Sequence, residues 1–196
     1  MAQSFCVDAS LPANDNLDQR SDLDLIAAIN NGEAGAFDVL YFRYRDWVAN
    51  LAHRFTGDND AALDVLQETF IYVLKKFPGF RLTANFKTFL YPAVRNLSIA
   101  SRRKTQRYQS RETEQAGLQN LPAAETALHA QSDLNYVLGS LSEQHREVLL
   151  LRFVDGLSLA EIAEAMAIPT GTVKSRLHNA LDLLRKDPRT KEFFGR

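Results

Sequence analysis

The chain has 196 residues, 45% of them hydrophobic, which is enough to bury one medium core or two small ones. Its single cysteine, Cys6, excludes an internal disulfide framework, and its four scattered histidines lack zinc-ligand spacing. The formal net charge of -1 hides a segregated pattern, because Arg81 to Arg111 contains several Arg and Lys residues but no Asp or Glu. The composition therefore leaves a nucleic-acid partner open.

The sequence gives no sign of targeting or of catalysis. The first residues lack the basic start and apolar core of a signal peptide, and no apolar run is long enough to cross a bilayer. Neither a Gly-rich phosphate loop nor a nucleophile motif occurs. We expect a cytoplasmic protein that is not an enzyme, with no membrane insertion, cofactor, metal or small-molecule substrate.

Residues 1–20 have no sustained hydrophobic period and are predicted to form a mobile leader. Ser21, followed three residues later by Asp24, predicts a capped short helix through Ile29, and Asn31-Gly32 is a helix stop signal. A long helix is expected next. Its buried stripe comprises Phe37, Leu40, Tyr41, Tyr44, Val48, Leu51, Ala52 and Phe55.

A third helix is predicted from about residue 60 to residue 77, with Pro78-Gly79 ending it. Its expected buried residues are Leu63, Leu66, Phe70, Val73, Leu74 and Phe77. The opposite face carries Asp64, Gln67, Glu68, Ile71 and Lys75. An acidic face cannot favour DNA phosphates and suits a basic protein surface better, although the sequence pattern alone favours a plain solvated helix exterior.

After a loop over 80–85, a fourth helix is expected to bury Phe86, Phe89, Leu90, Ala93, Val94 and Leu97. Lys87, Tyr91, Arg95, Ser98 and Arg102 are expected on its outer side, and the loop before it contributes Arg81, Thr83 and Asn85. Such a face suits single-stranded or melted nucleic acid, because cations follow the backbone while an aromatic ring stacks on a base. The alternative is an ordinary solvated basic face.

Residues 105–131 are rich in Gln, Glu, Ser and Ala, contain Gly117 and Pro122, and are predicted to be a flexible linker. A second apolar pattern opens at Leu134, Val137, Leu138 and Leu141, and Ser142 begins a helix carrying Val148, Leu149, Leu151 and Phe153. No convincing strand signal occurs. We therefore predict an all-α protein with two small helical domains, 21–104 and 132–186, and a tail over 187–196.

The most informative stretch runs from Gly156 to Leu177 and predicts a helix-turn-helix. Ser158 and Glu161 form a capping box that starts a helix at Leu159, and the break falls near Ala167-Ile168, before Pro169. The second helix is expected to place Val173, Leu177, Ala180, Leu181 and Leu184 inward. Its free polar side chains, suited to phosphates and base edges, are Thr170, Thr172, Lys174, Ser175, Arg176 and Asn179.

These motifs together resemble bacterial RNA polymerase sigma factors of the extracytoplasmic-function group. The second conserved domain of that family is matched by segments at residues 66–70, 80–81, 86–91 and 94–97, and the fourth by residues 141–152 followed by the helix-turn-helix. The likeness covers nearly everything from Asp22 to Lys186. Two motif sets in the correct order, with a linker between them, make the resemblance specific.

The resemblance implies a dissociable polymerase subunit with three contact surfaces. Asp64, Gln67, Glu68 and Ile71 would dock on the clamp coiled coil of the largest core subunit, with the flap as a further core contact. The helix-turn-helix would enter the major groove of the upstream (-35) element through Thr170, Thr172, Lys174, Ser175, Arg176 and Asn179. Melted bases of the start-proximal (-10) element would be captured by Arg81, Thr83, Asn85, Lys87, Thr88, Tyr91, Arg95, Arg102 and Arg103. An anti-sigma factor is an expected partner, because free basic faces need masking when the factor is idle.

Four positions depart from the family pattern. Phe89 stands where Trp is usual, which keeps an aromatic ring but loses the indole N–H, and Asn179 replaces a frequent Arg. Pro92 follows Tyr91, and a proline inside a helix costs about 3 kcal/mol unless the helix kinks or starts late. Ala167 replaces the usual turn Gly, so we expect this turn to avoid positive φ.

Other readings of these residues belong to different classes of protein. A helical hairpin in an all-helical core would also show short helices with polar outer faces. A stand-alone regulator would use the helix-turn-helix on duplex DNA without core polymerase, with the first domain serving as a dimerisation or sensor module. An enzyme acting on nucleic acid is disfavoured, because no catalytic constellation is present.

Overall fold

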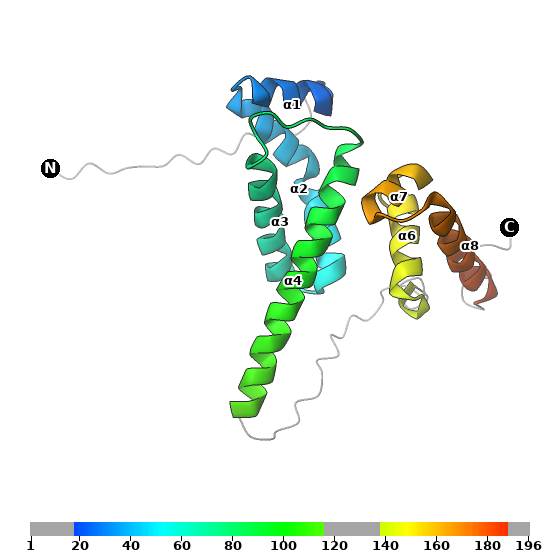
Figure 1. Ribbon diagram of the computed structural model, residues 1–196. Coiled ribbons are helices and arrows are strands. Elements are labelled where there is room, and N and C mark those ends of the chain that lie inside the picture. The colour runs from blue at the N-terminus through cyan, green and yellow to red at the C-terminus, as the bar shows by residue number, and fades with distance from the viewer. Residues whose placement is uncertain (1–17, 116–137, 188–196) are drawn as a thin grey trace. The chain divides into compact units, whose positions relative to one another are not determined.

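The computed structural model describes residues 18–115 and 138–187, and every regular element in those ranges is an α-helix, as predicted (Figure 1). The predicted leader as far as residue 17, the linker over 116–131, Leu134 and Val137, and the tail from residue 188 lie outside the described residues. The chain divides into two compact units, 1–83 and 84–196. Each unit is a helical assembly and is described separately.

The first unit contains α1 (Asp22–Asn30), α2 (Ala34–Thr56) and α3 (Asn59–Leu74), and α2 packs against both of the others. The predicted capping box is confirmed, since the Ser21 side chain accepts from the Asp24 N–H and the Asp24 carboxylate accepts from Ser21. The α2 helix ends at Thr56 and is capped by Gly57, whose φ of 71° is the left-handed conformation that glycine adopts at little cost.

The α3 helix is shorter than predicted and buries a different stripe. It ends at Leu74, three residues before Phe77. Its buried residues are Ala62, Val65, Leu66, Thr69, Phe70 and Val73. The prediction that Leu63 and Leu74 are buried is wrong, because both side chains are about half exposed, at 51% and 52%. Leu63, Gln67, Ile71 and Leu74 follow one another at helical spacing, so the two leucines lie on the same row as the polar face.

The second unit begins with α4 (Phe86–Gln115). Asn85 caps this helix, because its Oδ1 accepts from the Lys87 N–H at 2.9 Å and its carbonyl accepts from the Phe89 N–H. Pro92 lies inside the helix, which neither starts after it nor stops before it. The helix also continues well past Thr105, so the first part of the predicted linker is helical rather than irregular. The regular spacing of apolar residues stops near Thr105, but the helix itself continues to Gln115.

Within residues 138–187 this unit also contains α6 (Glu143–Phe153), α7 (Leu159–Met166) and α8 (Thr170–Lys186). The predicted starts are confirmed. Ser142 caps α6 by accepting from the His145 N–H, and Ser158 and Glu161 form the capping box of α7. A core cluster joins α6 and α8 through Leu141, Leu149, Ala180 and Leu184, with Leu138, Leu177 and Leu181 packed against it.

The turn between α7 and α8 does not avoid positive φ, so that prediction is wrong. Ala167 has φ 52° and ψ 45°, and its N–H bonds back to the carbonyls of Ala163 and Glu164. A tight reversal after α7 needs a left-handed residue to satisfy the last carbonyls of the helix. Ala167 therefore adopts the conformation that glycine would take more easily, and Pro169 then serves as the N-cap of α8.

The predicted domain boundaries, 21–104 and 132–186, stay a prediction, because the division into compact units follows contacts alone. We expected the fourth helix to end a domain over 21–104, whereas the compact units separate between Thr83 and Ala84. The α4 helix makes numerous contacts with α7, which groups it with the helix-turn-helix. Contacts between segments far apart in sequence decide this grouping, and hydrophobic periodicity carries no information on them.

Candidate nucleic-acid and core-polymerase interfaces

The outer face of α8 presents the polar side chains that the sequence predicted for it. Thr170, Lys174, Ser175 and Asn179 are exposed, while Thr172 and Arg176 are half-buried. The Ser175 hydroxyl donates to the Thr172 carbonyl at 3.0 Å, which leaves its oxygen available as an acceptor. The inner face is anchored by Val173, Ala180 and Leu184. A rigid helix with its N-terminal half polar and uncovered can present donors to base edges and phosphates.

Contacts around α7 fix the turn that precedes it and its N-terminus. The Arg152 guanidinium on α6 donates to the Leu157 carbonyl at 2.9 Å, which fixes the turn before α7. The Ser158 N–H donates to Glu161 at 2.8 Å, and this backbone hydrogen bond is the main reason why the pKa of the Glu161 carboxyl is lowered. The sequence motif thus has its expected geometry, with both orphan N–H groups satisfied.

A second surface lies on the exposed row of α3. Asp64, Gln67, Glu68 and Ile71 are all exposed, and Ile71 is 51% exposed although it is aliphatic. Leu63 and Leu74 extend this row in both directions. Sequence reasoning missed the two leucines because it assigned apolar residues to the core by type. Their spacing from Gln67 and Ile71 was the signal that could have placed them on this face.

The loop that carries Arg81 and Thr83 is fixed to the end of α1. Asn30 Oδ1 accepts from the Gly79 N–H at 2.6 Å, and Asn30 Nδ2 donates to the Phe80 carbonyl at 2.8 Å. Arg81 and Thr83 themselves are exposed. One side chain therefore orders the start of a loop that has no regular structure, and leaves the loop's polar side chains open to solvent.

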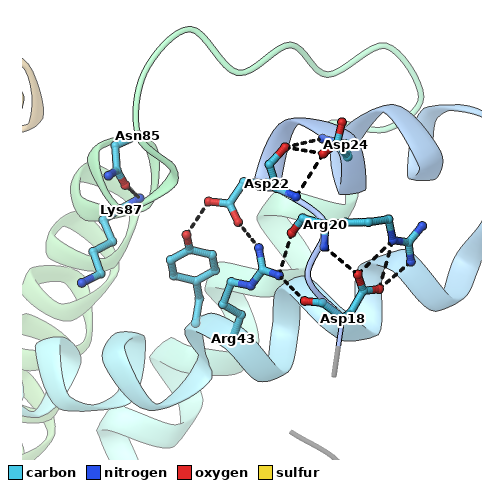
Figure 2. A network of polar contacts seen from close by, with 9 residues as sticks. Asp18, Arg20, Asp22, Asp24, Arg43, Asn85 and Lys87 are labelled. Atoms are coloured by element: carbon cyan, nitrogen blue, oxygen red, sulfur yellow. Dashed lines mark hydrogen bonds and ion pairs between the residues drawn. The ribbon is translucent and has the colours of Figure 1, made fainter. Parts of the chain in front are cut away.

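A polar network secures the beginning of α1 against α2 (Figure 2). Arg43 donates to the Asp22 carboxylate at 2.6 Å and to the carbonyls of Asp18 and Arg20, and the Tyr44 hydroxyl also donates to Asp22. Arg20 is paired with Asp18, and this hydrogen-bonded contact lowers the pKa of the Asp18 carboxyl to about 2. Burial and the Asp22 contact raise the pKa of Tyr44. These contacts are structural and fix the helix that carries Asn30.

The predicted strand-capturing face of α4 is only partly open. Arg102 and Arg103 are exposed, and Lys87 and Arg95 are half-buried. Thr88 and Tyr91 are buried, Tyr91 completely so, and Ser98 is also buried. The prediction that Tyr91 and Ser98 line the outer side of the helix is therefore wrong, because other helices cover a wider arc of α4 than its apolar stripe alone indicates.

The polar groups of this face contact α6 and the turn that follows it. The Tyr91 hydroxyl donates to the Glu147 carboxylate, and Arg95 Nε pairs with the same oxygen at 3.1 Å. Lys87 Nζ donates to the Asp155 carbonyl at 2.9 Å. Glu147 is a residue that sequence reasoning missed, since a glutamate in the polar first half of a helix carries no sign of a partner far away in the chain.

Within residues 18–115 and 138–187, no group of three or more His, Cys, Asp or Glu side chains could hold a metal ion. In the same ranges, no helix combines the length and the apolar character that a membrane span requires.

Comparison with known proteins gives two parts of the chain a family, and the first of these parts includes most of α4. The family model for sigma-70 region 2 matches residues 40–108, and the model for sigma-70 region 4 matches residues 137–186. The chain is 30% identical to the ECF RNA polymerase sigma factor SigW of Bacillus subtilis (strain 168), over 84% of this chain and 95% of that protein. It is 31% identical to the ECF RNA polymerase sigma-E factor of Escherichia coli (strain K12), over 85% of this chain and 94% of the relative.

Solved structures share the fold. The sigma factor RpoE, in complex with the anti-sigma factor NepR from Bartonella quintana, matches with a TM-score of 0.58 and 23% identity, covering 76% of this chain and 94% of that one. CnrH, in complex with the cytosolic domain of CnrY, matches with a TM-score of 0.60 and 22% identity, covering 83% of this chain and 93% of that one.

Proposed function

Because the chain belongs to the extracytoplasmic-function group of RNA polymerase sigma factors, which direct promoter-specific transcription initiation, we propose that its three surfaces divide the work of that family. In this proposal α3 docks on core polymerase, α8 reads the upstream element, and the loop before α4 together with α4 captures the melted start-proximal strand. The observation that carries the proposal is the uncovered polar face of α8, which has Lys174 and Arg176 and no acid before Asp182.

The proposed core contact is an aliphatic row edged by carboxylates. Leu63, Ile71 and Leu74 are each about half exposed, and contiguous exposed apolar groups rimmed by polar residues mark protein interaction sites. Asp64 and Glu68 add the negative charge that would orient a basic partner surface. In the family this partner is the clamp coiled coil of the largest subunit, with the flap as a further core contact. Leu63 and Leu74 are our additions to the predicted docking set.

The proposed upstream contact uses the N-terminal half of α8. A helix-turn-helix places this part of its second helix in the major groove, where Lys and Arg donate to guanine and Thr or Ser to several bases. Thr170, Lys174 and Ser175 are exposed there. Asn179 lies two turns beyond Thr172. Its side chain is shorter than the arginine usual at that position and extends less far toward a phosphate.

The proposed start-proximal contact combines the Arg81 and Thr83 loop with the basic residues of α4. Lys87, Arg95, Arg102 and Arg103 would follow a single-stranded backbone. Tyr91 is fully buried in this structure, so its ring would have to be uncovered before it could stack on an unpaired base. The energy of these contacts would offset the few kcal/mol that unstacking a base costs. No catalytic step is assigned to the chain itself, and the polymerase supplies the chemistry. Because bacterial transcription takes place in the cytoplasm, we place the chain there.

An anti-sigma factor is a further proposed partner. The matched RpoE structure is a complex with the anti-sigma factor NepR, and the matched CnrH structure is a complex with the cytosolic domain of CnrY. This chain likewise carries a basic surface and an exposed aliphatic surface that a protein could cover.

Reconstituted transcription tests the proposal. The purified chain and core polymerase are combined with a library of random upstream sequences, and the RNA 5′ ends are sequenced. We expect the transcription start sites to share a pair of upstream sequence elements. Core polymerase without the chain should not select these elements. Glu68→Lys should reduce selection by weakening core association, while duplex binding by the isolated chain stays unchanged. Specific duplex binding with no core-dependent transcript would favour the stand-alone regulator instead.

A further inference from the structure

The loop that carries Arg81 and Thr83 has no regular structure of its own. The Phe77 N–H still bonds to the Leu74 carbonyl at the end of α3, and regular structure resumes only at α4. A loop of this kind adopts many conformations unless contacts from elsewhere in the fold restrict it. The structure supplies such contacts at the start of the loop.

Asn30, the last residue of α1, binds this loop with both ends of its side-chain amide. Its Oδ1 accepts from the Gly79 N–H at 2.6 Å, and its Nδ2 donates to the Phe80 carbonyl at 2.8 Å. Because a backbone N–H can only donate and a carbonyl can only accept, these two partners fix the orientation of the amide. Asn30 is half-buried on a helix whose Leu25 and Ile26 are core residues, so the amide is held on a firm support.

The hydrogen bond to the Phe80 carbonyl acts directly on Arg81. This carbonyl and the Arg81 Cα belong to the same planar peptide group, so holding the carbonyl also restricts where the Arg81 side chain begins. The Phe80 ring is held as well, because it meets the Phe77 ring edge to face with centroids 5.4 Å apart. Arg81 and Thr83 are exposed. The loop thus combines a restricted backbone at its start with two polar side chains open to solvent.

We propose that Asn30 is a positioning residue for recognition of the start-proximal element. It holds the loop in the conformation in which Arg81 and Thr83 meet the strand, without contacting DNA itself. The inference rests on the proposed function of this loop. A loop that is ordered before binding loses less conformational freedom on binding, and its affinity is higher for that reason. The cost of fixing the backbone of one residue corresponds to about a tenfold change in affinity.

The test uses the complete chain bound to core polymerase and a promoter fragment that the wild-type chain selects from the random library. The fluorescein-labelled probe joins a duplex upstream element to a single non-template strand over the start-proximal element. A second probe has a scrambled start-proximal element, and a third has a scrambled upstream element. The ratio of dissociation constants between scrambled and intact probes measures each recognition separately. This ratio does not depend on the fraction of folded protein, so a loss of stability alone does not change it.

Asn30→Ala should lower the start-proximal ratio about tenfold and leave the upstream ratio unchanged. Asn31→Ala is the matched control, because it makes the same substitution at the next residue, which is exposed. Ser21→Ala controls for stability, because it removes the N-cap of the same helix and does not touch the loop. Both controls should keep the wild-type ratios. An unchanged start-proximal ratio in Asn30→Ala, or an equal fall in Ser21→Ala, would overturn the inference.

Combined substitutions test whether Asn30 acts through the two side chains of the loop. In a chain that already carries Arg81→Ala and Thr83→Ala, adding Asn30→Ala should raise the dissociation constant for the intact probe by no more than about twofold. A further tenfold rise would mean that Asn30 acts elsewhere, contrary to the inference. If Asn30→Ala folds poorly, Asn30→Asp replaces it. This variant keeps an acceptor for Gly79 but loses the donor to Phe80, so it should also lower the start-proximal ratio.

Failure of the proposed function gives a different result. Either no shared elements would emerge from the library, or the wild-type start-proximal ratio would itself be close to one. Both outcomes would remove strand capture from the loop, and the inference with it. The outcomes that contradict the role of Asn30 alone all require a large wild-type ratio.

Discussion

Asn30 holds Gly79 through a hydrogen bond of 2.6 Å from the Gly79 N–H to its side-chain oxygen, while its amide donates to the next carbonyl, that of Phe80. Residues 49 positions apart are thereby joined by a single side chain. The loop that carries Arg81 and Thr83 starts from these two hydrogen bonds, so a residue outside the proposed DNA-contacting set determines where that loop begins.

Replacing Asn30 with Ala should destabilise the protein by about 1–2 kcal/mol, because two backbone groups lose their partner. Thermal or urea unfolding measures this change. Asn30→Asp keeps the acceptor for Gly79 but places a charge beside the Phe80 carbonyl, so it should not restore full stability. Wild-type stability in Asn30→Ala would mean that the loop is held by other contacts.

Replacing Ala167 with Gly should stabilise the protein by about 1 kcal/mol, because a residue with a Cβ pays that amount to occupy the left-handed region. The melting temperature is the measurement. Ala160→Gly is the matched control. Ala160 is an exposed helical residue of α7, so the same chemical change should there be destabilising. If both variants melt lower, the Ala167 conformation carries no strain.

Leu63→Gln should weaken association with core polymerase by about tenfold, since it removes apolar surface from the α3 row while keeping a good helix former. Unfolding should be little affected, because Leu63 is already half exposed. Leu23→Gln provides the control on α1, where Leu23 is 60% exposed. Fluorescence titration with labelled core gives both affinities, and equal losses would remove Leu63 from the docking surface.

Arg176→Ala should weaken binding of the isolated chain to upstream-element duplex. If its contact is only to phosphate, the slope of log affinity against log salt should become shallower by about 1, with sequence preference unchanged. Arg185→Ala makes the same substitution near the C-terminus of α8, and it should leave the slope close to the wild-type value. Unchanged affinity in Arg176→Ala would exclude Arg176 from the interface.

The Asp18 and Arg20 pair should make stability depend on pH in the acid range. The pKa of Asp18 is lowered from 3.8 to about 2 in the folded chain, so its contribution is complete well above pH 3.8 and declines as pH falls toward 2. Asp18→Asn should therefore melt below wild type at pH 7, and the difference should shrink below pH 4. A constant difference across that range would argue against the ion pair.

The sequence by itself determined those features that depend on residues close together in the chain. Ser21 with Asp24 and Ser158 with Glu161 cap their helices as predicted, since a capping box involves only residues three positions apart. The inner face of α8 and the acidic row of α3 followed equally from helical periodicity. The two motif sets were sufficient to identify the family.

The tertiary structure decided everything that depends on partners distant in the chain. Leu63 and Leu74 are exposed because the neighbours of α3 cover another stripe, and Tyr91 is buried because Glu147 and other residues surround it. Ala167 adopts positive φ because the second helix must turn back onto α6. Periodicity shows which side of a helix is apolar, whereas only the packed chain fixes how much of each side is covered and which charge meets which donor.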